Sequence, residues 1–154
     1  MGNSFRSSGS FGKRQEYIAV ARLLQKGFDV YMTLVDDQQI DCVVRIPGPK
    51  PSYVDIKIKA RSASAKQGST FSALDIKNAR ENFVFIFYSE VADTYWIMPS
   101  LDLIREANVG KEGKNSGNYS IVFANQLKDG TWKPRPRFEK WRDNWDLIYP
   151  LNKK

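Results

Sequence analysis

Two neighbouring stretches of strict apolar–polar alternation constrain the fold of this chain more than any other feature of its sequence. In residues 40–46 and 53–60, every second residue is hydrophobic, which predicts two strands that each bury one face. The segment 47–52 between them holds three prolines and a glycine and predicts a loop. Core-facing residues of paired strands share one face of a sheet, so the polar residues share the other. The expected hairpin therefore gathers the charged side chains on one face, namely Asp41, Asp55, Lys57 and Lys59.

A helix is expected before this hairpin, over residues 14–26, with Gly27 as its C-cap. Its predicted apolar face consists of Tyr17, Ile18, Val20, Ala21 and Leu24. Glu16 lies on or beside the core-facing side, because Val20 and Leu23 follow it at i+4 and i+7. A buried carboxylate without a partner costs several kcal/mol. Glu16 therefore needs a cation, which is either a basic side chain or a metal ion.

The rest of the sequence predicts one α/β domain over residues 11–154, preceded by a flexible leader rich in Ser and Gly over residues 1–10. A continuous apolar run over 83–88 predicts a buried central strand. Phe138, Trp141, Trp145 and Ile148 recur at helical spacing. The other expected elements are strands over 28–35, 94–98 and 119–124, a helix over 73–82, and a helix over 100–107 capped by Ser100.

Composition excludes several kinds of chemistry. The chain of 154 residues has no histidine, which rules out Ser-His-Asp triads, histidine zinc sites and a histidine base. Its single cysteine, Cys42, cannot form an intrachain disulfide and suits a reducing compartment, so a cytoplasmic location is expected. No apolar run approaches the ~20 residues of a membrane-spanning helix, and no membrane partner is expected. The net charge of +7 is what a phosphate-binding surface would produce.

The order of these features resembles the PD-(D/E)XK superfamily of metal-dependent nucleases, which includes restriction enzymes and junction resolvases. The residues that carry the resemblance are Glu16 in Gly12-Lys13-Arg14-Gln15-Glu16, Asp41 in Gln39-Ile40-Asp41-Cys42-Val43-Val44, and the strand Val54-Asp55-Ile56-Lys57-Ile58-Lys59-Ala60-Arg61-Ser62. The resemblance covers the first part of the chain, up to the loop after this strand. It implies a restriction-endonuclease-like α/β core, with the N-terminal helix packed on a mixed central sheet and further helices flanking it.

The resemblance also implies an activity, namely Mg²⁺- or Mn²⁺-dependent hydrolysis of a phosphodiester, with DNA as the expected nucleic acid. It assigns metal binding to Glu16, Asp41 and Asp55. It assigns catalysis to Asp41 and Asp55 together with Lys57 and Lys59. The basic residues that flank this site are expected to contact nucleic acid, and they are Lys13, Arg14, Arg61 and Lys66. Enzymes of this family that cut both strands are usually dimers, so a homodimer belongs to the same expectation.

Two registers of the motif fit the sequence equally well. In the first register, Asp55 is the second metal ligand and Lys57 the catalytic lysine. In the second, Lys59 is the family lysine and Lys57 stands where an acid is usual, which would weaken metal binding. Two functions other than cleavage therefore remain open: a DNA-binding module that has lost its metal site, and a protein-interaction module.

Overall fold

The computed structural model describes residues 4–35, 38–65 and 68–150 of the chain, with the side chains of residues 4–8 and 115 outside the description. None of the helices in these ranges combines the length and hydrophobicity that crossing a bilayer requires.

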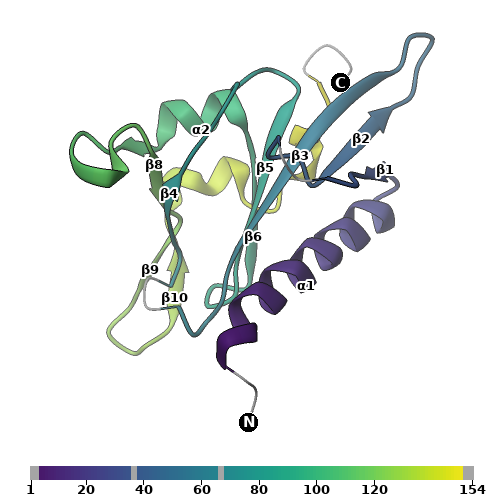
Figure 1. Ribbon diagram of the computed structural model, residues 1–154. Helices are drawn as coiled ribbons and strands as arrows, with labels where there is room; N and C mark the ends of the chain where they lie inside the picture. Colours follow the sequence, from purple (N-terminus) through teal and green to yellow (C-terminus); the bar gives the residue numbers. More distant parts are fainter. Residues whose placement is uncertain (1–3, 36–37, 66–67, 151–154) are drawn as a thin grey trace.

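A five-stranded mixed sheet forms the centre of the molecule (Figure 1). Its strands, in spatial order, are β1 (Asp29–Met32), β2 (Cys42–Ile46), β3 (Ser52–Arg61), β5 (Phe83–Ser89) and β6 (Thr94–Pro99). β3 and β5 run parallel, and all other neighbours run antiparallel. The helix α1 (Ser4–Gln25) packs on one face of this sheet. The expected α/β architecture, with an N-terminal helix on a mixed sheet, is thereby confirmed.

The hairpin of β2 and β3 has the predicted register. Cys42 pairs with Ile56 and Val44 pairs with Val54, and all four side chains are buried on the face that α1 covers. The apolar run of β5 is a central strand between β3 and β6, as its composition predicted. Because the hairpin keeps strict alternation, the charged residues of β3 all lie on the face away from α1.

Of the five residues predicted to form the buried face of α1, Val20 is buried and the other four are exposed. The helix buries Phe11, Gln15, Ala19, Val20 and Leu23, whereas Tyr17, Ile18, Ala21 and Leu24 are exposed. Apolar residues occur all round this helix, so helical spacing alone could not select the side that the sheet covers. The helix also begins at Ser4 rather than at residue 14, and so extends into the stretch expected to be a flexible leader. Gly27 ends it as predicted, in the left-handed conformation (φ 89°).

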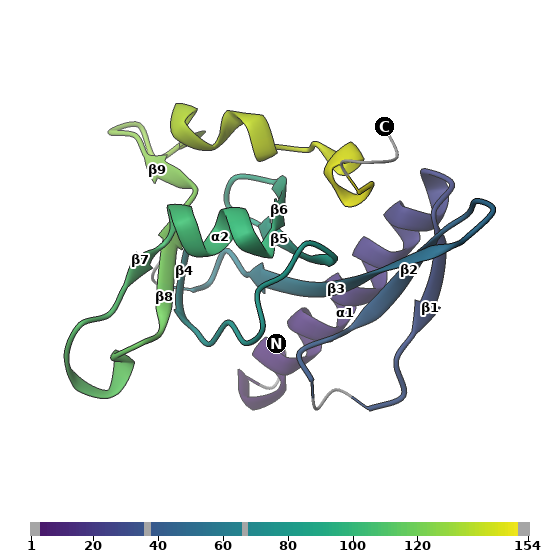
Figure 2. The ribbon, with the colours of Figure 1, turned by 90° about the horizontal axis from the view of Figure 1, so that it is seen from above.

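Smaller elements cover the opposite face of the central sheet (Figure 2). A three-stranded sheet joins β4 (Thr70–Leu74), β8 (Tyr119–Val122) and β7 (Asn108–Val109), and a two-stranded one joins β9 (Ala124–Gln126) and β10 (Trp132–Pro134). The other helices are α2 (Ser100–Glu106) and three 3₁₀ turns, η1 (Gly113–Asn115), η2 (Pro136–Trp141) and η3 (Trp145–Ile148). Unlike the rest, η3 packs Trp145 and Ile148 into the core on the α1 side of the sheet. Aromatic rings fill the space between these elements and the sheet. The Phe123 ring stacks on Trp96 at 4.6 Å and lies 5.0 Å from Phe87.

Three other expected elements differ from the structure. Residues 73–82 do not form a helix, because Ala73 and Asn78 both adopt positive φ angles of 55°, which interrupt any right-handed helix. The first strand is shorter than predicted, and Leu34 beyond its end is fully exposed. The C-terminal aromatic stripe is buried as its spacing indicated, but on η2 and η3 rather than on one α-helix. Ser100 begins α2 without capping it, since its hydroxyl bonds to the backbone of Arg80 instead.

Two adjacent leucines of α1 test which face the helix buries. The Leu23 side chain is 0% exposed and that of Leu24 is 55% exposed. We expect Leu23→Ala to lower the free energy of unfolding by about 2–5 kcal/mol, because it leaves a cavity in the core. Leu24→Ala, with the same change in helix propensity, should stay within about 0.5 kcal/mol of the parent. Urea denaturation measures both, and equal losses would contradict the orientation of α1.

Candidate functional site

The candidate site lies where β2 begins and β3 continues past it. The last pair of this ladder joins Cys42 to Ile56, while β3 continues to Arg61. The Asp41 backbone N–H still donates to the carbonyl of Ile56 at 2.8 Å. Two residues further along β3, the backbone N–H of Ile58 donates to Oδ2 of the Asp41 carboxylate at 2.7 Å. A side chain therefore replaces the missing strand and satisfies a buried backbone donor.

The second oxygen of this carboxylate faces a lysine. Lys57 Nζ lies 3.4 Å from Asp41 Oδ1, and the two side chains are only 13% and 4% exposed. The contact forms just beyond the Cys42–Ile56 pair at which the ladder ends, between Asp41, which precedes β2, and Lys57, which follows Ile56 on β3. Removing either member of such a pair leaves the other charge in a poorly hydrated site.

Glu16 brings a second negative charge to this place from α1. Its carboxylate accepts a hydrogen bond from Lys13 Nζ at 2.9 Å and is largely shielded from solvent. The pKa of the Lys13 ammonium is raised mainly by this hydrogen bond and by the charge of Glu16, and to a smaller extent by Asp41. Burial, followed by the charges of Asp41 and Glu16, raises the pKa of the Cys42 thiol to about 12. Both carboxylates therefore act on the same small region at the start of β2.

Asp55 does not join them. It lies opposite Val43, two residues before Lys57 on β3, and its carboxylate forms an ion pair with the Arg80 guanidinium. Within the described residues, no group of three or more His, Cys, Asp or Glu side chains is arranged to hold a metal ion. Each of the expected acids thus has a basic partner of its own: Lys13 for Glu16, Lys57 for Asp41 and Arg80 for Asp55.

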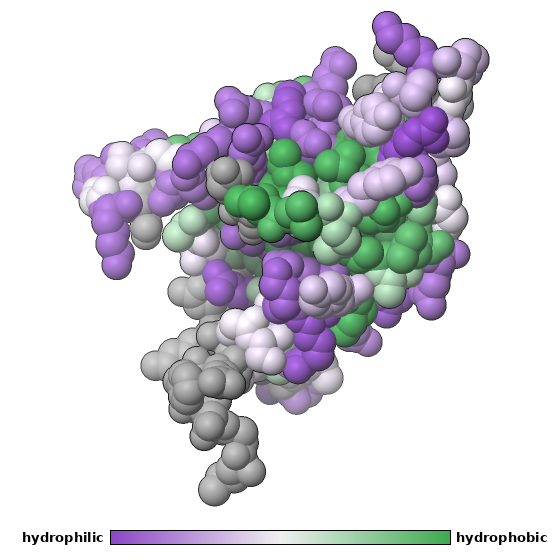
Figure 3. Space-filling view, turned by 45° about the vertical axis from the view of Figure 1, so that its right-hand side comes forward, coloured by the Kyte–Doolittle hydropathy of each residue, from purple (hydrophilic) through white to green (hydrophobic). Residues whose placement is uncertain are grey.

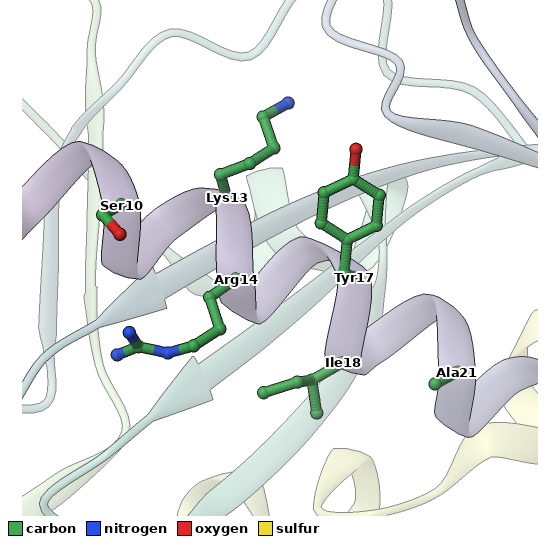
Figure 4. Close-up of a pocket in the computed structure, with 6 residues that line it drawn as sticks. All are labelled: Ser10, Lys13, Arg14, Tyr17, Ile18 and Ala21. Carbon is green, nitrogen blue, oxygen red and sulfur yellow. The ribbon is translucent and has the colours of Figure 1, made fainter.

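The expected basic residues surround the site unevenly. Lys59 follows Lys57 by two residues on the same face of β3. Arg61 is turned towards β4, where its Nε donates to the carbonyl of Thr70 at 3.0 Å. Lys66 lies outside the described residues. Lys13 and Arg14 project on either side of α1 (Figure 4), beside a shallow hollow along the outer surface of the helix.

Hydrophobic residues gather at the centre of one face of the molecule, among them the exposed apolar residues of α1 (Figure 3).

Arg80 is the residue of this region that the sequence did not indicate. It precedes β5, and its guanidinium stacks on the Phe83 ring at 4.6 Å and donates to the carbonyl of Asn78 at 2.7 Å. The sequence feature that could have pointed to Arg80 is its position shortly before the apolar run 83–88. Parallel neighbours begin at the same edge of a sheet, so a residue before β5 comes close to Asp55 near the start of β3.

One solved structure resembles this chain in fold. The structure of a bacterial homing endonuclease, I-Ssp6803I, superposes with a TM-score of 0.60 at 20% sequence identity, covering 89% of this chain and 89% of that one. No protein-family model matches the chain, and no curated protein matches its sequence. The chain therefore shares the fold of an endonuclease over nearly its full length, which confirms the expectation of a nuclease fold.

The Asp41–Lys57 pair can be tested by a double-mutant cycle. Asp41→Ala should lower the free energy of unfolding by about 3–5 kcal/mol, because the Lys57 ammonium and the Ile58 N–H both lose a buried partner. Adding Lys57→Met to this variant removes the ammonium that has lost Asp41, so the double variant should lose less than the sum of the two single changes. Chemical denaturation of the four proteins measures the coupling, and strictly additive losses would contradict the pairing.

Proposed function

We propose that this chain binds DNA at the open edge of β3 and hydrolyses its phosphodiester backbone with Mg²⁺ or Mn²⁺. The observation that carries the proposal is the nearly buried Asp41–Lys57 pair at the start of β2, in a chain that has the fold of an endonuclease. Glu16 on α1 adds a second negative charge that acts on the neighbouring Cys42. The net charge of +7 supports a polyanionic partner. Glu16, Asp41 and Lys57 belong to the residues expected from the PD-(D/E)XK resemblance, whereas Asp55, the third expected acid, is paired with Arg80.

The donor set fits a hard divalent cation. Mg²⁺ takes oxygen ligands, keeps several of its waters and is often bound by only one or two carboxylates. Glu16 and Asp41 would hold it. When bound, the cation polarises a phosphoryl oxygen and acidifies a water molecule. Lys57 and Lys59 would offset the negative charge that grows on the phosphoryl group. The bond from the Ile58 N–H fixes the orientation of the Asp41 carboxylate for this task.

The position of Lys57 supports a second candidate, a DNA-binding protein without cleavage. Lys57 rather than Asp55 stands opposite Asp41, which favours the register in which an ammonium takes the place of a metal-binding acid. In this register Lys59 is the family lysine. An ammonium beside Asp41 competes with a cation for the same carboxylate, so this version of the site binds metal weakly and binds phosphate well.

Cleavage assays separate the two candidates. We expect divalent-dependent cleavage of DNA that falls by at least about a hundredfold in Asp41→Asn, the scale expected when one electrostatic contact of a transition state is lost. Asp146→Asn, an exposed aspartate of η3, is the control and should cleave like the parent. Duplex, single-stranded and branched DNA are each tried with Mg²⁺ and Mn²⁺. Salt-sensitive binding without cleavage of any substrate would establish the second candidate and reject the first.

The register can be tested through metal binding alone. Lys57→Glu places a second carboxylate opposite Asp41, so Mg²⁺ should raise its melting temperature more than that of the parent. At a cation concentration of 100 times Kd, the gain in stability is about 2.7 kcal/mol. Lys57→Gln is the matched control, since it removes the ammonium without adding a ligand. An equal Mg²⁺ response of Lys57→Glu and Lys57→Gln would show that this position does not face the metal.

A further inference from the structure

A cavity of about 490 Å³ adjoins the candidate site. Two segments that are distant in the sequence line it: the one before β2 contributes Gln38, Gln39 and Ile40, and the one before β5 contributes Lys77, Asn78 and Arg80. Ile40 directly precedes Asp41 in the chain, and Arg80 is ion-paired with Asp55 on β3. The cavity therefore opens beside the charged residues of the hairpin. Its volume lies in the range of small-ligand sites, roughly 300–1,000 Å³.

The Gln39 side chain joins the two segments. Its Nε2 donates to the carbonyl of Asp75, and its Oε1 accepts from the backbone N–H of Lys77 at 3.2 Å. The two segments lie side by side on the molecule (Figure 2). A single amide thus satisfies one acceptor and one donor of an irregular segment, which fixes the walls of the cavity relative to each other.

Two residues of the lining have strained backbones. Gln39 and Asn78 adopt positive φ angles of 61° and 55°, a conformation that residues other than glycine take only at a cost. Such residues tend to cluster at ligand sites, where the surrounding contacts hold them in place. Here both of them line the same cavity.

Arg80 is held rigidly at the wall of this cavity. Ser100, which is fully buried, accepts from the Arg80 backbone N–H at 2.9 Å and donates to its carbonyl at 2.8 Å. The guanidinium is fixed by Asp55, by the Asn78 carbonyl and by the Phe83 ring. The side chain of Lys77, in contrast, forms an exposed pair with Asp75 at 3.3 Å, and exposed pairs of this kind cost little to break.

We propose that this cavity binds one nucleotide of the DNA strand engaged at the candidate site, an inference that rests on the proposed function. Lys77 is placed to turn from Asp75 to a phosphate, and the fixed Arg80 adds a second positive charge. The amides of Gln38 and Asn78 offer both donors and acceptors for a base edge, and Ile40 provides an apolar surface. The cavity thus contacts the nucleotide next to the phosphate at the Asp41–Lys57 pair.

The test uses two variants that leave the Asp41–Lys57 pair and the Arg80–Asp55 pair intact. Lys77→Ala should weaken binding of all labelled oligonucleotides and lower the slope of log Kd against log salt by about 1. Asn78→Gly removes the amide, while glycine accepts the positive φ without strain. It should reduce discrimination within a set of oligonucleotides that differ at single positions, by roughly 5- to 100-fold at the affected position.

Lys128→Ala is the matched control, because Lys128 is an exposed lysine in the turn between β9 and β10. It should leave base discrimination unchanged and lower binding less than Lys77→Ala. If the parent binds DNA and both cavity variants behave like Lys128→Ala, the cavity is not a nucleotide site while the proposed function stands. If the parent binds no DNA of any form, the proposed function and this inference both fail. Thermal melts confirm that the three variants are folded.

Discussion

The hydrogen bond from the Ile58 backbone to the Asp41 carboxylate is the contact on which the rest of the site depends. A strand that extends beyond the end of its neighbour leaves backbone N–H groups without a partner strand. When these groups are buried, they need another hydrogen-bond acceptor. Here one carboxylate oxygen takes that role, and the other remains beside Lys57. The position of the negative charge is therefore set by the geometry of the sheet rather than by a flexible loop. The same arrangement explains why an aspartate can be almost fully buried directly before β2.

The sequence predicted those parts of the fold in which the hydrophobic pattern is compatible with only one arrangement of the strands. The alternation around Val54 and Ile56 allowed one orientation of the hairpin, and the apolar run of β5 allowed only a central strand. The prediction failed for α1, because this helix has apolar residues on both sides and the choice between Leu23 and Leu24 depends on the sheet beneath it. It failed again over 73–82, where Ala73 and Asn78 have positive φ angles and Gln39, distant in the sequence, holds the segment through hydrogen bonds to Asp75 and Lys77.

The same limit applies to the site. Strand parity places Asp55, Lys57 and Lys59 on one face of β3, and this much follows from the sequence. Parity does not reveal which of them stands opposite Asp41, because that depends on where the ladder of β2 ends. Nor does it reveal that Arg80 comes to Asp55 from the start of a parallel strand. The likeness of fold to a homing endonuclease at 20% identity agrees with this division, since strand order is retained where local sequence is not.

The amide of Ile58 gives this protein a spectroscopic reporter within its own backbone. Most amide hydrogens of a central strand point to carbonyl groups and sense only their neighbours in the sheet. This one points to a carboxylate that also contacts an ammonium group, so its chemical shift will follow any redistribution of charge on Asp41. Titration of the labelled protein with a metal salt or an oligonucleotide can then be followed at one resonance, without a probe attached to the surface.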